Sequence, residues 1–277
     1  MASDPSAAGQ FGVYVCPVCK HALRHEQDVL RCPACCQAYP IVEGILEFLS
    51  EELSQSPDPE LRRMRFIDRM AGIYETRLWY PLVLKVYGRL HSPSLGQLIG
   101  AVSEEVRAIT GPVLDVACGP GTFGRRIASP AREVWGIDVS RGMLRQGAAY
   151  VAAEGISNMH FARARVEALP FADGLFAATV CCGSLHLFTD TLIALREMAR
   201  VMKPGAVLAV FTFTAGDRGI LRFRSIRQWS RRHHGLHVFE LPELEQCLAA
   251  AGFDNLRPKV TGSILTFSAR RRNAALV

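Results

Sequence analysis

Four cysteines near the N-terminus have the types and spacing of metal ligands. Cys16 and Cys19 form one C-x-x-C pair and Cys32 and Cys35 form another, with twelve residues between the pairs. Zinc in structural sites is held by four ligands in a tetrahedron, and each short pair offers two sulfurs from one loop. The sequence therefore predicts a zinc ribbon. Since protein sulfur fills all four positions, the predicted zinc is structural, and the adjacent Cys36 is expected to point away.

A glycine-rich segment carries the second chemical signal. Gly119, Gly121 and Gly124 follow the apolar run Val113–Ala117 in a G-x-G-x-x-G pattern. Such a turn from strand to helix brings backbone N–H groups close to a nucleotide ligand. Asp138, nineteen residues after Gly119, is placed to accept hydrogen bonds from ribose hydroxyls. These residues alone do not distinguish a nicotinamide or flavin nucleotide from a methyl donor.

Two histidines are candidate catalytic residues beside such a nucleotide. His186 lies four residues after Cys182, and His237 follows a basic segment that precedes the last long helix. An imidazole titrates near neutrality, which suits a base or an orienting donor. The alternative for His186 is a side chain that only packs or caps its loop. Cys181 and Cys182 are interpreted as small core residues at a strand end rather than nucleophiles.

The elements that must position these residues alternate along the chain from residue 112 onward. Five apolar runs are the predicted parallel strands: 113–117, 133–137, 160–164, 177–182 and 207–213. Helices fill the gaps between them, and after a helix at 240–251 the runs 255–260 and 264–269 predict a final hairpin. This order predicts an α/β fold with a Rossmann-like, seven-stranded, mostly parallel sheet and a C-terminal antiparallel hairpin.

The remaining segments complete the predicted domain organisation. Residues 1–50 are the ribbon, and residues 51–60, rich in Ser, Pro and acids, are a linker. Residues 61–277 form the main domain, in which 61–100 supply N-terminal helices and 216–239 an inserted helical lid.

The predicted lid combines apolar and basic residues at helical spacing. Phe223, Ile226 and Trp229 share one face, and five arginines surround it. We expect the apolar face to turn inward and the basic face outward. A cover over an apolar ligand, a surface for an anionic group and an ordinary solvated helix are the three interpretations.

Composition sets limits on the whole chain. The 277 residues are 49% hydrophobic and 21% charged, which suits one large α/β core with a small module. The net charge of +6 permits contacts with anionic partners without requiring them. No apolar run approaches the about 18 residues of a membrane span, and Met1–Val15 does not resemble a signal peptide. A soluble cytoplasmic protein with reduced thiols is expected.

Four linked motifs resemble the class I (Rossmann-like) S-adenosylmethionine-dependent methyltransferases. The likeness is strongest to the methyltransferase type 11 branch related to the ubiquinone and menaquinone biosynthetic enzymes. The motifs, in chain order, are 114–121, 136–140 with Met143-Leu144, 168–171 with Asp173-Gly174, and 200–205. Segments 77–90, 184–186 and 237–239 resemble a group of uncharacterised plant plastid and bacterial methyltransferases that also carry a cysteine ribbon.

The resemblance implies S-adenosylmethionine as the cofactor. Ala117 and Gly119 would line its methionine part, Asp138 would hold the ribose, Met143 would pack near the adenine, and Asp115 would help to bind the amino end. The complete predicted cofactor set is Tyr74, Asp115, Ala117, Cys118, Gly119, Gly121, Asp138, Val139, Met143, Arg165, Val166 and Cys182.

Arg165 departs from the family pattern. The family usually has an aspartate here that accepts a hydrogen bond from the adenine amine, whereas arginine carries donors only. Backbone groups around Val166 would then read the adenine, or Glu167 would replace the aspartate, or the affinity for the cofactor would be low.

The resemblance also implies the kind of reaction. We expect O-, N- or C-methylation of a small, largely apolar or aromatic metabolite, in a site walled by Tyr74, Trp79, Tyr80, Phe188, Phe223 and Trp229. A ribosomal RNA guanine-N1 methyltransferase family also has such a ribbon, so RNA is an alternative partner. Few fixed positive charges in this ribbon make RNA the weaker interpretation. A non-catalytic, partner-binding protein of the same fold is the third. The sequence does not determine an oligomeric state.

Overall fold

The computed structural model describes residues 11–49, 82, 84, 93–215, 223–234 and 236–273, without the side chains of 232–234. The predicted linker, most of the predicted N-terminal helices and part of the predicted lid lie outside these residues. The same holds for Tyr74, Trp79 and Tyr80, so the predictions made for them stay predictions.

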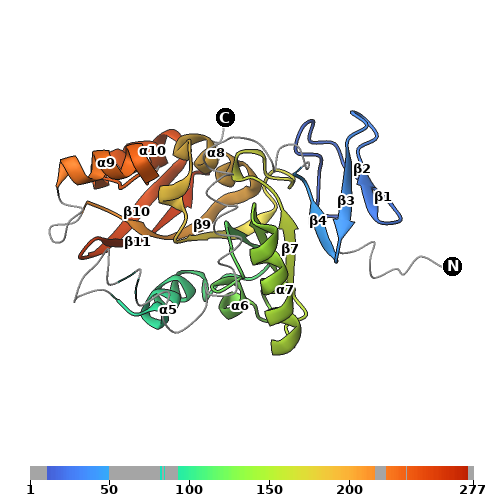
Figure 1. The fold of residues 1–277 in the computed structure, drawn as a ribbon, viewed down its shortest axis with the longest axis horizontal. Helices are drawn as coiled ribbons and strands as arrows, with labels where there is room; N and C mark the ends of the chain where they lie inside the picture. The colour runs from blue at the N-terminus through green and yellow to red at the C-terminus, as the bar shows by residue number, and fades with distance from the viewer. Residues whose placement is uncertain are drawn as a thin grey trace.

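Within the described residues, one sheet of eleven strands runs through the whole molecule (Figure 1). The strand order is β1-β2-β3-β4-β7-β6-β5-β8-β9-β11-β10. The strands are β1 Arg24–Glu26, β2 Val29–Arg31, β3 Ala38–Val42, β4 Ile45–Glu47, β5 Val113–Val116, β6 Val134–Asp138, β7 Met159–Arg163, β8 Phe176–Cys182, β9 Met202–Phe213, β10 Phe253–Thr261 and β11 Ile264–Arg271.

The seven strands β5–β11 form the predicted α/β sheet. β5 lies at the centre and pairs in parallel with β6 and β8, and every residue of β5 and β6 is buried. Continuous apolar runs form such strands because both faces of a parallel sheet are covered. β11 inserts antiparallel between β9 and β10, and Gly262 takes a left-handed conformation in the hairpin turn. The predicted fold class is confirmed.

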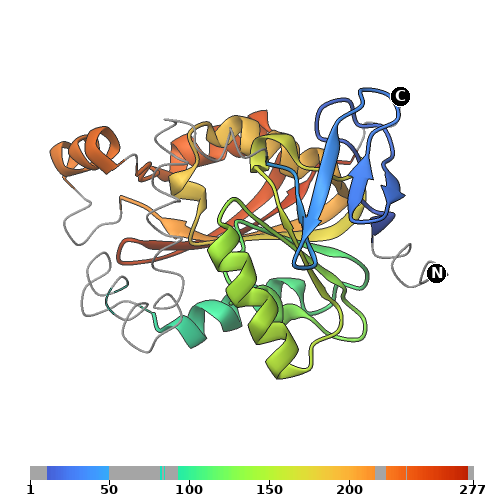
Figure 2. The same cartoon turned by 45° about the vertical axis from the view of Figure 1, so that its right-hand side comes forward.

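Helices cover both faces of this sheet (Figures 1 and 2). On one face lie α5 Leu95–Val106, α6 Gly124–Ile127 and α7 Arg141–Glu154, and on the other lie α8 Thr191–Val201 and α10 Leu241–Ala250, while α9 Arg224–His234 stands away from the sheet on that same side. Each face has its own apolar cluster, and the two clusters are separated by the sheet. Among the described residues, no helix is long and apolar enough to cross a membrane.

Helix α7 begins where β6 ends, and its sequence explains why. The Ser140 hydroxyl accepts a hydrogen bond from the Met143 backbone N–H, which caps the first turn. Met143 and Leu144 are buried and fix the helix against the sheet. Gly155, with φ 66°, ends the helix in a left-handed C-cap. These local rules place Asp138 and Val139 in a short, well-determined connection.

The last strand of the ribbon joins it to the main sheet. After β3 the chain turns at Glu43 and Gly44 and adds β4, which pairs antiparallel with β3 and in parallel with β7. Three buried residues show no alternation of apolar and polar side chains, so the pattern does not reveal such a strand. The ribbon strands therefore continue the central sheet.

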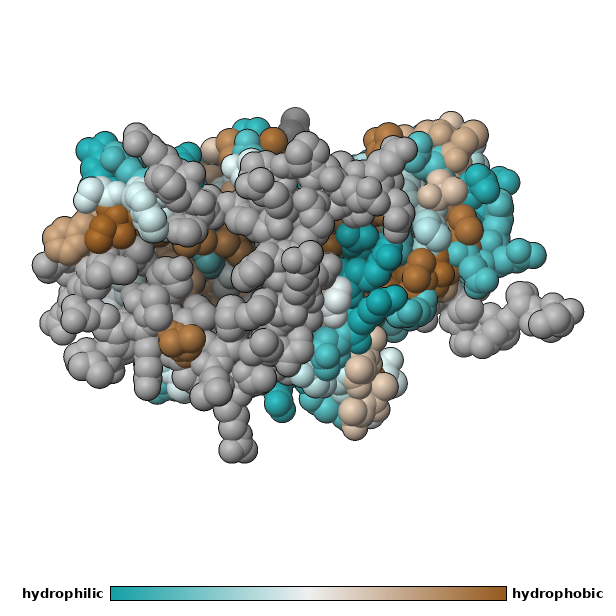
Figure 3. Space-filling model, in the orientation of Figure 1, coloured by the Kyte–Doolittle hydropathy of each residue, from teal (hydrophilic) through white to brown (hydrophobic). Residues whose placement is uncertain are grey.

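The ribbon also shares a core with the main sheet. Tyr14 stacks on Phe171 with ring centroids 5.2 Å apart and meets Trp135 edge-on at 5.5 Å. The Val15 backbone N–H donates to the Pro170 carbonyl at 2.9 Å. The space-filling view shows a band of hydrophilic side chains where α7 meets the ribbon strands (Figure 3). The junction thus has an apolar side and a charged side.

Candidate functional site

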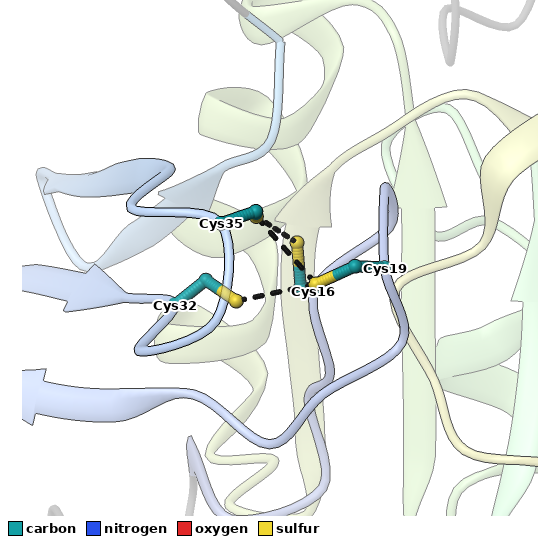
Figure 4. A group of neighbouring side chains, drawn as sticks. All are labelled: Cys16, Cys19, Cys32 and Cys35. Carbon is teal, nitrogen blue, oxygen red and sulfur yellow. Dashed lines mark hydrogen bonds between the residues drawn. The ribbon is translucent and has the colours of Figure 1, made fainter.

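The four predicted zinc ligands converge on one point (Figure 4). Their sulfurs all lie within 4.8 Å of one another, with Cys16–Cys35 at 3.5 Å and Cys19–Cys32 at 3.3 Å. Sulfurs bound tetrahedrally to zinc at about 2.3 Å stand about 3.8 Å apart. Four thiols at this spacing fit a zinc ion. Cys36 is exposed and outside the cluster, as predicted.

Backbone geometry builds the two cysteine loops in the same way. The Lys20 N–H donates to the Cys16 carbonyl and the Cys36 N–H to the Cys32 carbonyl, at 2.8 and 3.0 Å. Lys20 and Cys36 both take left-handed conformations, with φ near 60°. The Tyr39 hydroxyl lies 3.1 Å from Cys16 Sγ and adds a polar contact behind the cluster.

The glycine loop follows β5 as a tight, left-handed turn. Ala117, Gly119 and Gly121 have φ values of 52°, 55° and 76°. A Cβ atom on Gly121 would lie 2.7 Å from Met159 Cε, so Met159 would have to move to admit a side chain. The glycine therefore allows the loop to pack closely on β7, and the contact of the loop with S-adenosylmethionine stays a prediction.

Asp138 connects the glycine loop to helix α7. Its Oδ2 accepts a hydrogen bond from Gly119 N–H and its Oδ1 one from Ser140 N–H, both at 2.8 Å. The residue is 8% exposed, at the carboxyl end of β6. Ligands of open α/β sheets bind at this edge. A carboxylate held by two backbone N–H groups suits a contact with two vicinal hydroxyls.

Asp115 lies buried beneath the same loop. Its Oδ2 accepts a hydrogen bond from Gly124 N–H at 3.0 Å, which ties the end of β5 to the start of α6. Burial raises the pKa of this carboxyl to about 7, although the Gly124 bond acts in the opposite direction. The nearby charge of Asp138 is a smaller contribution to the same rise. A cationic ligand group nearby would favour the ionised form.

The segment predicted to lie near the adenine has an unusual charge arrangement. Met143 and Val166 are buried, and their contact with an adenine stays a prediction. Arg165 Nε donates a hydrogen bond to Glu167 Oε2 at 3.2 Å. Arg165, which departs from the family pattern, therefore binds the glutamate that is one candidate to take the role of the family's aspartate. Glu167 Oε1 is buried and accepts no hydrogen bond from the described part of the chain. The structure thus keeps one free acceptor in this segment.

The loop after β8 lies against the glycine loop. Ser184 Oγ donates to the Ala117 carbonyl at 3.3 Å, and His186 Nδ1 lies 3.2 Å from Thr212 Oγ1. Burial lowers the pKa of His186 to about 3, so its imidazole stays neutral at physiological pH. The expected match of its pKa to neutrality is wrong. A neutral, hydrogen-bonded imidazole instead suits an orienting role.

His237 is joined to His186 through the backbone. Its N–H donates to the His186 carbonyl at 2.7 Å. Its imidazole stacks on Phe239 at 4.5 Å, and Nε2 lies 2.9 Å from a Glu243 carboxylate oxygen at the start of α10. The structure therefore brings both candidate histidines to one end of the sheet.

Three cysteines of the main domain are core residues. Cys118, Cys181 and Cys182 are buried, and burial raises the pKa of each thiol above its ordinary value. Thiols that remain protonated are poor nucleophiles, which agrees with their interpretation as core residues. The predicted contacts of Cys118 and Cys182 with the cofactor stay predictions.

The described part of the predicted lid is only partly as expected. Helix α9 exists, but Phe223 and Trp229 are 47% and 53% exposed, so the expected inward apolar face is wrong. The helix stands away from the sheet, and its residues are too polar overall to bury that face. Arg224, Arg231 and His237 help to line a cavity of about 240 Å³ beneath it. Phe188 is buried in the core.

Three charged residues near Asp138 were missed by the sequence analysis. Glu47 is 2% exposed and contacts Arg141 at 2.8 Å and Arg163 at 3.1 Å. The sequence does contain a feature that indicates two of them: a charged residue lies between apolar residues at 45–49 and again at 162–164. Buried charges are found in pairs, so each such residue predicts a partner of opposite sign.

Comparison with known proteins agrees with this geometry. Residues 113–205 match the family described as a methyltransferase domain, and residues 15–44 match the Trm112p-like protein family. The ubiquinone/menaquinone biosynthesis C-methyltransferase UbiE of Pasteurella multocida is 39% identical over 106 residues, 37% of this chain and 40% of that protein. An uncharacterised chloroplastic methyltransferase of Arabidopsis thaliana is 29% identical over 170 residues, 58% of this chain and 48% of the relative. The chain spans less than half the length of both relatives.

A solved structure shows the same fold. It is a complex that contains the Trm112 methyltransferase activator of Haloferax volcanii, and it matches with a TM-score of 0.58 at 12% identity, over 78% of this chain and 99% of that chain. The sheet order, the four ordered motifs and these matches confirm the resemblance. The chain has the class I methyltransferase fold, with a segment at 113–205 similar to a methyltransferase domain and a segment at 15–44 similar to the Trm112p-like family.

Proposed function

We propose that this protein is an S-adenosylmethionine-dependent methyltransferase of a small, largely apolar or aromatic metabolite. The observation that carries the proposal is the Asp138 carboxylate, which accepts N–H bonds from both the glycine loop and the start of α7. This arrangement presents a fixed carboxylate beside a glycine-rich turn. The likeness of the matched segment to small-molecule methyltransferases supports the choice of substrate class.

The described residues divide the work of binding. Bound S-adenosylmethionine would supply an electrophilic methyl group for in-line displacement. Ala117, Gly119 and Gly121 would hold the methionine part, and Asp138 the ribose. The surface around Met143 and Val166 would cover the adenine. Asp115, with its raised pKa, would respond to the positive charge of the amino end.

The histidines would act on the methyl acceptor. Methyl transfer depends mainly on the position of the acceptor, so a rigid neutral imidazole at His186 serves orientation better than proton removal. His237, whose Nε2 lies 2.9 Å from Glu243 Oε1, is the better candidate for a proton acceptor, because this contact fixes the orientation of its ring. The lid at 216–239 would close over the acceptor. We place the protein in the cytoplasm, where its thiols stay reduced.

Calorimetric titration tests the cofactor directly. We expect S-adenosylmethionine and S-adenosylhomocysteine to bind with micromolar affinity and NADH not to bind, because the motifs around Asp138 belong to methyltransferases. Incubation with methyl-labelled cofactor and a panel of phenols, quinols and carboxylic acids then identifies the acceptor class. Binding of NADH alone contradicts the proposal.

RNA methylation is the second candidate, and the Trm112p-like match is the observation that favours it. Arg31 is engaged by Glu26 at 3.1 Å and Lys20 by Glu197 at 3.4 Å, which reduces the positive charge that the ribbon offers to phosphates. If the ribbon does not bind RNA, its role would be to stabilise the main domain of the same chain. A gel shift with total RNA at two salt concentrations separates the candidates, since RNA binding falls steeply with salt.

A further inference from the structure

A buried carboxylate of the ribbon lies within reach of the cofactor site. Glu47 is the last residue of β4, the strand that joins the ribbon to the main sheet. It is 2% exposed, and its two oxygens contact different guanidinium groups: Oε1 accepts from Arg141 Nε and Oε2 from Arg163 Nη1. One carboxylate therefore holds two cations in place.

Three charges of alternating sign stand in one row of the sheet. Glu47 is the register partner of Arg163 on β7, and Arg163 is the register partner of Asp138 on β6. Side chains at the same level of neighbouring strands point to the same face of the sheet. The row reads carboxylate, guanidinium, carboxylate, and its first member comes from the ribbon.

Both arginines also hold the connection that carries Asp138. Arg163 Nε donates to the Val139 carbonyl at 2.8 Å, one residue after Asp138. Arg141 is the first residue of α7, directly after the Ser140 cap whose N–H bonds the Asp138 carboxylate. Movement of either guanidinium group would disturb the backbone on which that carboxylate depends.

We propose that Glu47 is a positioning residue for cofactor binding, which holds Arg163 and Arg141 on the ribbon side and thereby fixes the connection that presents the Asp138 carboxylate to ribose hydroxyls. Without the Glu47 charge, the nearest carboxylate in the row for Arg163 is Asp138. A guanidinium–carboxylate pair is strong and bidentate, so it would compete with hydroxyl groups for the same oxygens. This inference rests on the proposed function, because it concerns the same cofactor.

The same hairpin supplies a matched control. Glu43 also reaches helix α7, where its carboxylate lies 2.7 Å from Arg145 Nη2, one turn beyond Arg141. Its side chain is 58% exposed and that of Arg145 50%, so this pair joins the same two elements without contacting the Asp138 connection. Loss of an exposed pair has little effect.

The test compares affinity for S-adenosylhomocysteine by calorimetry, with zinc content and melting temperature measured for each variant. We expect Glu47→Gln to bind at least tenfold more weakly than the wild type and Glu43→Gln within twofold of it. Equal losses in both variants, or no loss in Glu47→Gln, would overturn the inference. Because glutamine at this buried position can unfold the chain, Glu47→Asp is a second variant. It keeps the charge but is too short for both arginines, so we expect a smaller loss, and unchanged affinity there also counts against the inference.

A double-mutant cycle separates positioning from general stability. If Glu47 acts through Asp138, Glu47→Gln adds no further loss in an Asp138→Asn background, whereas additive losses contradict this route. Equilibrium dialysis with labelled S-adenosylhomocysteine measures the weak binding of these variants. A wild-type chain that does not bind the cofactor overturns the proposed function itself. Binding by the wild type with no effect of Glu47→Gln overturns only the role of Glu47.

Discussion

At the scale of single residues, Asp115 links ionisation to stability. Its ordinary pKa is 3.8, and burial raises it to about 7 in the folded chain. Between these values the folded chain binds the proton more strongly than the unfolded chain, so this group lowers the free energy of unfolding as the pH rises from 4 to 7. Above pH 7 the full cost of the buried charge remains.

Asp115→Asn removes this dependence and keeps the shape of the side chain. We expect its free energy of unfolding, relative to the wild type without cofactor, to rise by roughly 2 kcal/mol between pH 5 and pH 8. Urea denaturation at the two pH values measures the difference. A constant difference across this range would show that the carboxyl ionises normally in the folded chain.

Residue types and spacing were enough to predict the glycine loop and the place of Asp138 beside it. Gly119 and Asp138 stand where strand order and motif spacing put them, because parallel strands end at one edge of a sheet. Burial and partners were not predictable in the same way. The neutral state of His186 depends on its packing, and the importance of Glu47 depends on two arginines about a hundred residues away in the chain.

At the scale of elements, helix α8 anchors the ribbon and the segment after β7. Glu197 accepts hydrogen bonds from Lys20 Nζ, the Leu169 N–H and the Arg200 guanidinium. Burial opposes its ionisation, but the Arg200 and Lys20 charges and the backbone bond together lower the pKa of Glu197 below its ordinary 4.5. The ionised carboxylate therefore stabilises the folded chain, and that contribution is lost as the pH falls below 4.5.

Replacement of Glu197 by glutamine should weaken this anchor. We expect a loss of about 2 kcal/mol in the free energy of unfolding at pH 7, the scale of hydrogen bonds to a charged group, and a smaller loss below pH 4. Denaturant unfolding at both pH values checks this. Glu104→Gln, which breaks an exposed pair with Arg107, is the control and should change little. Equal effects of the two substitutions on the free energy of unfolding would contradict the anchoring role of Glu197.

Long elements were predicted well and short ones were not. The strands of the main sheet and α10 carry continuous or periodic apolar patterns, and their positions are confirmed to within a few residues. β4 is three residues long and buried on both sides, so its sequence has no period to detect. The face of α9 could not be predicted, since a helical stripe shows which residues align and not which neighbour they meet.

At the scale of the whole molecule, the ribbon and the main sheet share one apolar cluster. Cys16, Leu30 and Tyr39 belong to the same cluster as Leu114 and Trp135. Removal of zinc would free the cysteine loops and loosen this common core, because a structural zinc site contributes its binding energy to folding. The consequence should extend beyond the first fifty residues.

We expect calorimetric unfolding of the zinc-loaded chain to show one transition. After treatment with a chelator, that single transition should move down by about 10 °C or more, since several kcal/mol of metal binding are lost. The same treatment of Cys19→Ser, which starts with a weakened site, should produce a smaller shift. Two separate transitions, with the upper one insensitive to the chelator, would show that the ribbon unfolds by itself.

The pairing of β4 with β7 has a consequence for how the protein responds to dilution. β7 is a strand that would otherwise end the main sheet, and the strand that covers it belongs to the same polypeptide. A tethered strand has an effective concentration in the millimolar range, far above that of a separate chain. Cover of this edge is therefore independent of protein concentration. A ribbon from a second molecule would have to displace β4, which stays attached to β7 through its own polypeptide chain.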